Sequence, residues 1–218
     1  RDLVVTGVQT CALPICAWSP SLDSDDEDAM REFTERLAQW QQKALREAKL
    51  RSHWLWPDEA YEQASRAFLE EALLGDPACR EALAAAAREL DLPGAINGLA
   101  QATLRMTVPG VPDLYQGTEY WDFSLVDPDN RRPVDYAARR ASLGRGEAPA
   151  EALGHWRDGH VKQARVQRLL RLRSQYPAPF AEGDYRPPHV VGDRQAPVLG
   201  FTRHHGRHAR RARLLPLP

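Results

Sequence analysis

Hydrophobic positions recur at helical spacing through the first half of the chain, which predicts a series of α-helices. The first predicted helix follows an acidic stretch and carries apolar residues at intervals of three and four: Met30, Phe33, Leu37, Trp40, Ala44 and Ala48. Pro57 marks a boundary after it, because the residue before a proline avoids the helical region. Three further helices are predicted over residues 58–74, 77–90 and 95–106. Gly75 and Pro93 separate them, since both residue types interrupt helices.

The pattern changes at residue 108. Pro109, Pro112 and Gly117 argue against a helix, and the residues between them predict a short buried strand over 111–115. A long polar and aromatic segment without periodicity follows, which compact domains keep mainly where it serves a function. Helical spacing returns over residues 134–143 and 158–176, and alternation predicts strands over 184–191 and 197–203. These elements together predict an α-rich α/β fold.

Composition and charge exclude several classes of function. The 218 residues carry a net charge of −1, so no overall field favours nucleic acid or an anionic membrane. No stretch approaches the roughly 20 apolar residues that span a bilayer. Cys11, Cys16 and Cys79 lack metal-ligand spacing to histidines, and their odd number is typical of unpaired thiols in a cytoplasmic protein. We therefore expect no nucleic-acid or membrane partner, no metal site and no cofactor.

The polar segment after the predicted strand holds the candidate chemistry. Five polar residues crowd into one turn with Asp-Pro punctuation: Asp127, Asp129, Asn130, Arg131 and Arg132. A strand that ends in such a loop and is followed by a helix is how a (β/α)8 barrel builds its active-site face.

These residues also carry a family resemblance. The sequence G-V-P-D-L-Y-Q-G-T-E (residues 110–119) resembles the eighth barrel strand of the α-amylase superfamily, glycoside hydrolase family thirteen. The continuation W-D-F-S-L-V-D-P-D-N-R-R-P-V-D-Y and the upstream K-A-L-R-E-A-K-L-R-S-H-W (residues 43–54) resemble one branch of that superfamily. The resemblance covers roughly residues 17–203. It implies the C-terminal part of a (β/α)8 barrel with a helical insert, followed by the start of an all-β C-terminal domain.

The resemblance also implies domain limits. Residues 17–107 would be a helical insert between barrel strands seven and eight, and 108–177 the last strand, active-site loop and helix of the barrel. Residues 178–218 would begin a truncated C-terminal β-domain. Residues 1–16 resemble translated sequencing-adapter read-through rather than protein, although a strand pair or a weak secretory signal also fits them. The basic tail 204–218 departs from the expected apolar strand, which favours a frameshift over an arm for an acidic partner.

The implied reaction is intramolecular transglycosylation, which converts the reducing-end α-1,4 linkage of a maltooligosaccharide into an α,α-1,1 linkage. The retaining mechanism of the superfamily needs two carboxyl groups. In the superfamily these groups follow strands four, five and seven, which precede the matched region, so we assign no catalytic residue here and expect the chain alone to be inactive. The implied partners are an α-glucan substrate and a maltooligosyl trehalose trehalohydrolase that takes up the product.

The residues expected to bind substrate come from three places. They are Tyr115 and Gln116 at the strand end, Asp127, Asp129, Asn130, Arg131 and Arg132 in the loop, and Trp54 upstream. Two alternatives stay open. Trp54 can stack on a sugar ring or fill a gap between helices, and Arg131 and Arg132 can hold glucose or merely pair with Asp127, Asp129 or Asp135 to fix the loop.

Two rival functions remain at this point. One is another glucosidase or transglycosylase of the α-amylase superfamily, which the strand motif allows but the Asp-Pro-Asp-Asn-Arg-Arg sequence disfavours. The other is a non-enzymatic helical module that binds a partner or nucleic acid through the basic tail, and this leaves residues 108–136 unexplained.

Overall fold

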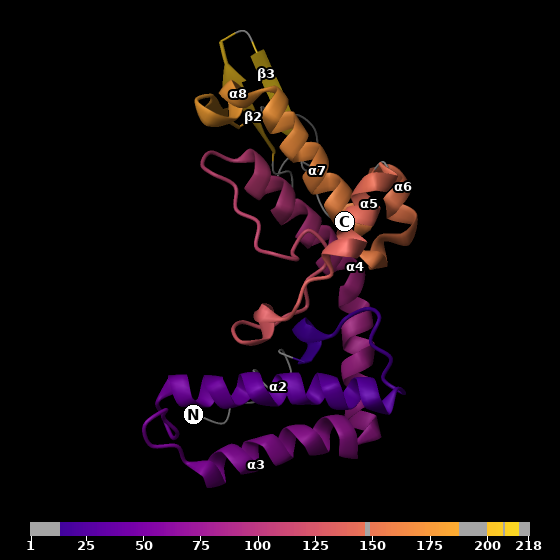
Figure 1. The fold of residues 1–218 in the computed structure, drawn as a ribbon, viewed down its shortest axis with the longest axis vertical. Coiled ribbons are helices and arrows are strands. Elements are labelled where there is room, and N and C mark those ends of the chain that lie inside the picture. Colours follow the sequence, from indigo (N-terminus) through magenta and orange to yellow (C-terminus); the bar gives the residue numbers. More distant parts are fainter. Residues whose placement is uncertain (1–13, 147–148, 188–199, 207, 214–218) are drawn as a thin grey trace, which may run out of the picture. The chain divides into compact units, whose positions relative to one another are not determined.

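The computed structural model describes residues 14–146, 149–187, 200–206 and 208–213 (Figure 1). The chain divides into two compact units, which are described separately. The first comprises the chain up to Leu92 together with Phe123–Pro133, and the second comprises Pro93–Asp122 and the chain from Val134 onward. The predicted adapter segment lies almost wholly outside the described residues.

The first unit is helical. It contains α2 (Glu27–Ala48), α3 (Glu59–Glu70), the π-helical turn η1 (Glu71–Gly75) that continues α3, the start of α4 (Pro77–Thr107) and a short 3-10 turn, η2 (Asp129–Arg131). Helices α2 and α3 lie side by side (Figure 1). Asp26 caps α2 by accepting hydrogen bonds from the N–H groups of Asp28 and Ala29, which satisfies donors that the helix leaves free.

The first half of the predicted apolar stripe of α2 forms the core of this unit, whereas Ala48 at its end is exposed. Met30, Phe33 and Leu37 are buried, as predicted. They pack with residues from α3, η1, α4 and the two flanking segments: Ala17, Trp18, Leu69, Leu73, Ala84, Ala87 and Leu125. Trp18 meets the Phe33 ring edge-on, with ring centroids 5.2 Å apart. Residues 17 and 18, where the family resemblance begins, therefore belong to the core.

The predicted break between two helices at Pro93 is wrong. α4 continues through Pro93 as one helix of 31 residues. An interior proline removes one hydrogen bond and costs roughly 3 kcal/mol. Buried residues on both sides, Ala84 and Ala87 before the proline and Met106 after it, fix the helix in each unit and outweigh that cost. The proline does coincide with the boundary between the units.

The second unit combines the rest of α4 with later helices and a small sheet. Its elements are α5 (Tyr136–Arg145), α6 (Pro149–Ala152), η3 (Leu153–Asp158), α7 (His160–Gln175), α8 (Pro177–Ala181), β1 (Asp184–Arg186), β2 (Gly200–His205) and β3 (His208–Arg213). The strands pair antiparallel in the order β1-β2-β3. Met106, Val166 and Leu169 form a small core between α4 and α7. Both predicted strand regions thus contain a strand, although residues 188–199 lie outside the described part.

The predicted strand over residues 111–115 is not formed. This segment has no regular secondary structure, and Val111 is 96% exposed. A single strand cannot satisfy its own backbone groups, because every ladder hydrogen bond comes from a neighbouring strand. A strand at this position would need a neighbouring strand, and none of the strands in the described residues pairs with it. Among the described residues, no helix is long and apolar enough to cross a membrane.

Candidate functional site

The loop of residues 123–133 is fastened to α2 by a buried ion pair. Arg36 donates from Nε and Nη2 to the two carboxylate oxygens of Asp129, each at 3.0 Å. The same Nη2 also donates to the carbonyl oxygen of Phe123 at 3.0 Å. The second Asp129 oxygen accepts the N–H of Leu125 at 2.7 Å, so one carboxylate orders both the loop and its attachment. Two parallel charge-assisted bonds are among the strongest hydrogen bonds in proteins.

The protonation state of Asp129 follows from these contacts. Burial alone would raise the pKa of its carboxyl, but the Arg36 guanidinium and the Leu125 N–H together hold that pKa below its usual value. Asp129 is therefore ionised at neutral pH, and its carboxylate is committed to holding the loop.

A second anchor lies two helical turns away. Lys43 Nζ donates to the Asp127 carbonyl oxygen at 2.6 Å and to its carboxylate at 3.0 Å. Arg36 and Lys43 are seven residues apart, which places them on one face of α2. The loop thus rests on α2 at two points. Lys43 opens the upstream motif that carries the family resemblance, so the structure joins that motif directly to the loop motif.

The two loop arginines pair within the loop and still face outward. Arg131 contacts Asp127, and Arg132 lies 3.2 Å from the Asp129 carboxylate and donates to its carbonyl oxygen at 3.1 Å. The side chain of Arg131 is 71% exposed and that of Arg132 is 47% exposed. Fixing the loop and offering N–H donors to a ligand are therefore compatible. The side-chain oxygen of Asn130 is buried, with no hydrogen-bond partner among the described residues.

Trp54 lies in the connection between α2 and α3, and it is exposed rather than buried. The alternative of a gap-filling tryptophan is therefore wrong for this structure. The guanidinium of Arg46 lies 5.1 Å from the centre of its ring. Arg46 in turn donates to both carboxylate oxygens of buried Glu62, at 2.8 and 2.7 Å, and Ser52 and Gln42 also donate to that carboxylate. The buried carboxylate of Glu62 thus holds the guanidinium that lies over the ring of the exposed tryptophan.

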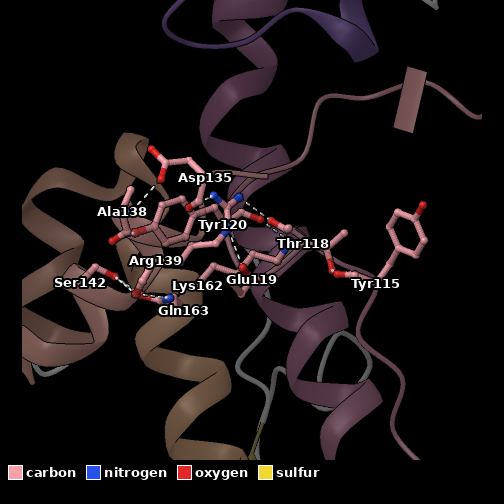
Figure 2. A network of polar contacts seen from close by, with 11 residues as sticks. Tyr115, Thr118, Glu119, Tyr120, Asp135, Ala138, Arg139, Ser142, Lys162 and Gln163 are labelled. Carbon is pink, nitrogen blue, oxygen red and sulfur yellow. Dashed lines mark hydrogen bonds and ion pairs between the residues drawn. The ribbon is translucent and has the colours of Figure 1, made fainter. Parts of the chain in front are cut away.

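Tyr115 and Gln116 belong to the second unit. Both are exposed, and the turn that follows them is held by Arg139 of α5 (Figure 2). Arg139 pairs with Glu119 at 2.5 Å, donates to the Gly117 carbonyl at 2.9 Å, and stacks over the Tyr120 ring at 4.5 Å. Figure 2 shows the ring of Tyr115 standing apart from this network. The network thus fixes the backbone after Tyr115, while the ring of Tyr115 stays exposed to solvent.

Replacing Arg139 with lysine should loosen this turn. Lysine keeps the charge but lacks the planar fork that contacts Glu119 and Gly117 together. We expect a loss of about 1.5–3 kcal/mol in the local free energy of opening, the range of charged hydrogen bonds. Amide hydrogen exchange over residues 117–122 measures it. Arg140→Lys, at the exposed neighbouring position, is the matched control and should leave this exchange unchanged.

Three basic residues of α7 point into the second unit, which sequence reasoning missed. Lys162 donates to the Tyr120 carbonyl at 3.0 Å, Arg165 to the Thr103 hydroxyl at 3.2 Å, and Arg173 to the Met106 carbonyl at 2.9 Å. Burial lowers the pKa of Lys162, although the carboxylates of Asp122 and Glu119 oppose this shift. These side chains tie α7 to α4 and to the turn after Tyr115.

The structure thus brings together only part of the predicted site. Asp127, Asp129, Asn130, Arg131 and Arg132 form one loop in the first unit, and Trp54 lies in the same unit. Tyr115 and Gln116 lie in the second unit. The role of Arg36 was not predicted. Its seven-residue spacing from Lys43 indicates that the two residues share one face of the helix, but no sequence pattern indicates that they bind Asp129 and Asp127.

We compared the sequence and the structure of the chain with those of known proteins. No family model matches the chain. A protein of Mycobacterium tuberculosis assigned as a maltooligosyl trehalose synthase is 40% identical over 168 residues, which cover 77% of this chain and 20% of that protein. A crystal structure of a maltooligosyl trehalose synthase superposes on 87% of this chain with a TM-score of 0.74 and 28% identity. The chain matches one part of a maltooligosyl trehalose synthase.

The maltooligosyl trehalose synthase of Arthrobacter ramosus gives the same result. It is 36% identical, with a TM-score of 0.70 over 89% of this chain and 24% of that structure. The chain spans about a fifth of the length of the curated relatives it matches. The resemblance predicted from the sequence is therefore confirmed, and it applies to one segment of the enzyme.

Proposed function

We propose that this chain forms one wall of the substrate site in a maltooligosyl trehalose synthase. The full-length enzyme would convert the reducing-end α-1,4 linkage of a maltooligosaccharide into an α,α-1,1 linkage and release its product to a trehalohydrolase in the cytoplasm. The observation that carries this proposal is the loop 123–133. It is fixed on α2 at Asp127 and Asp129 and leaves the guanidinium groups of Arg131 and Arg132 exposed.

The chemistry of the reaction calls for such a wall. A retaining enzyme of this type breaks the terminal linkage and holds the remaining glucan as a glycosyl-enzyme. The released glucose must then turn over and attack through its own anomeric hydroxyl. If that glucose leaves, or if water enters, hydrolysis replaces transfer. Rigid donors such as Arg131 and Arg132 suit this task because their loop does not have to be ordered when sugar binds.

The reacting carboxylates are proposed to lie elsewhere in the full-length enzyme, so no residue of this chain is given a catalytic role. Residues 111–115 would become the last strand of a (β/α)8 barrel when neighbouring strands pair with them. The sequence G-V-P-D-L-Y-Q-G-T-E, which resembles the eighth strand of that barrel, supports this assignment. Tyr115 and Gln116 would then offer an aromatic face and an amide at the mouth of the barrel, and Trp54 a second face for stacking.

Replacing Arg132 with alanine in the full-length enzyme tests the proposal. We expect free glucose to rise at the expense of the trehalose-ended product, because the enzyme loses a donor that retains the freed glucose. A severalfold change in this ratio corresponds to about 1 kcal/mol. Quantifying both products from maltopentaose provides the measurement.

Arg88→Ala is the control, because Arg88 forms an exposed pair with Glu81 on α4. An unchanged product ratio in the Arg132 variant would assign this arginine to loop fixation alone. If the wild-type enzyme released mainly free glucose from maltopentaose, this would instead favour a glucosidase of the same superfamily.

A further inference from the structure

A cluster of two histidines and an aspartate lies at the corner where η3 meets α7. We propose that His155, Asp158 and His160 bind a divalent transition-metal ion of the zinc type. His155 Nδ1 lies 2.6 Å and His160 Nδ1 lies 3.2 Å from the same oxygen of Asp158, Oδ2. One ligand atom from each residue lies within 4.8 Å of the other two. This inference is independent of the proposed sugar chemistry.

The backbone explains why the three side chains converge. Gly159 adopts φ +81°, a left-handed conformation that turns the chain sharply between Asp158 and His160. The N–H of His160 donates to Asp158 Oδ1 at 2.9 Å, which fixes the carboxylate and leaves Oδ2 facing both imidazoles. The sequence H-x-x-D-x-H thus brings three possible ligand atoms together in one short segment.

Packing from outside the cluster holds this geometry. The His160 ring meets the ring of Tyr120 edge-on, with centroids 5.2 Å apart. A Cβ on Gly159 would lie only 3.0 Å from the backbone nitrogen of Trp121, so the turn is pressed against that segment. Trp121 Nε1 also donates to the carbonyl of Trp156 at 2.6 Å. Such supporting contacts orient metal ligands and raise affinity.

The donor set selects the class of metal. Two imidazole nitrogens and one carboxylate oxygen suit zinc and its neighbours in the first transition row, whereas magnesium and calcium prefer oxygen ligands alone. Three protein ligands leave a coordination position for water. His155 and Asp158 are exposed, so an ion can enter from solvent. A bound ion would cross-link η3 to the first turn of α7 and thereby brace the segment that carries Tyr120.

Zinc titration of the full-length protein that carries this chain tests the site. After dialysis against chelator, isothermal titration with Zn²⁺ should show a binding step that His155→Ala and Asp158→Asn weaken by at least about tenfold, the lower range for disturbed metal sites. Asn can still accept the His160 N–H, so the second variant keeps the turn. Co²⁺ should give visible absorption that both variants lose.

His53→Ala serves as the control, because it removes a histidine from the α2–α3 connection and should leave zinc binding unchanged. The proposal would be overturned if the wild-type protein showed no zinc step, or if His155→Ala and Asp158→Asn bound zinc as the wild type does. Both readouts are independent of sugar turnover, so the proposed function can fail without affecting this result.

Discussion

Replacing Asp129 with alanine should release the 123–133 loop from α2 and lower the local stability of the first unit by about 3–5 kcal/mol. This is the usual cost of removing one partner from a buried ion pair. The substitution leaves the Arg36 guanidinium, whose side chain is 19% exposed, without its carboxylate. It also removes the acceptor of the Leu125 N–H, and Leu125 belongs to the core of the unit.

Hydrogen exchange at the Leu125 amide is the direct measurement for this variant, because that N–H bonds to Asp129 itself. Exchange should accelerate by two or more orders of magnitude, which corresponds to about 3 kcal/mol. Asp113→Ala is the control: Asp113 is highly exposed and lies 3.9 Å from Arg105. Its loss should change stability by less than about 0.5 kcal/mol. Unchanged protection of Leu125 in the Asp129 variant would show that the ion pair does not hold the loop.

Replacing Glu62 with glutamine should have the second largest effect. Glu62 is buried and accepts hydrogen bonds from Arg46, Ser52 and Gln42. The Arg46 hydrogen bonds, with smaller help from Ser52 and Gln42, lower the pKa of its carboxyl from 4.5 to about 2, although burial opposes the shift. A shift of this size corresponds to roughly 3 kcal/mol of stability at neutral pH.

The sign of the pH dependence follows from the direction of this shift. The folded-state pKa of Glu62 lies below its unfolded value, so the unfolded state binds the proton more readily between pH 4.5 and about 2. The stabilisation from Glu62 is therefore present above pH 4.5 and is lost as the pH falls through that window. In Glu62→Gln this acid-dependent component should be missing.

Unfolding followed from pH 7 to pH 2 checks this prediction, with Glu81→Gln as the matched control. Glu81 forms an exposed pair with Arg88, and exposed pairs contribute at most about 1 kcal/mol. The wild type and the control should lose stability between pH 4.5 and 2, and the Glu62 variant should be less stable at pH 7 with a flatter profile. Parallel profiles for all three proteins would contradict the assignment.

The helical part of the fold could be predicted because its signals are local. The stripe of Met30, Phe33 and Leu37 depends only on the spacing of neighbouring residues along one helix. Pro93 shows the limit of such signals. A proline predicts a break, and only the packing on both sides of α4 reveals that the helix continues.

The site was predictable in composition but not in contacts. The polar residues of the loop stand out in the sequence. That Asp129 is buried against Arg36, 93 residues earlier, is a tertiary contact without a local signal. The same holds for Arg139 and Lys162, which look like surface cations in the sequence and instead fix the turn after Tyr115. Residues 111–115 illustrate a third case, since a strand there needs a pairing partner and none of the strands in the described residues provides one.

The action of the full-length protein on maltopentaose is the most direct test of the proposed trehalose-forming activity. Reducing ends should disappear while the number of glucose units per chain stays the same, because the terminal linkage is rearranged rather than cut. A rise in reducing ends, with shorter products, would contradict it and show hydrolysis. Unchanged maltopentaose would contradict it as well.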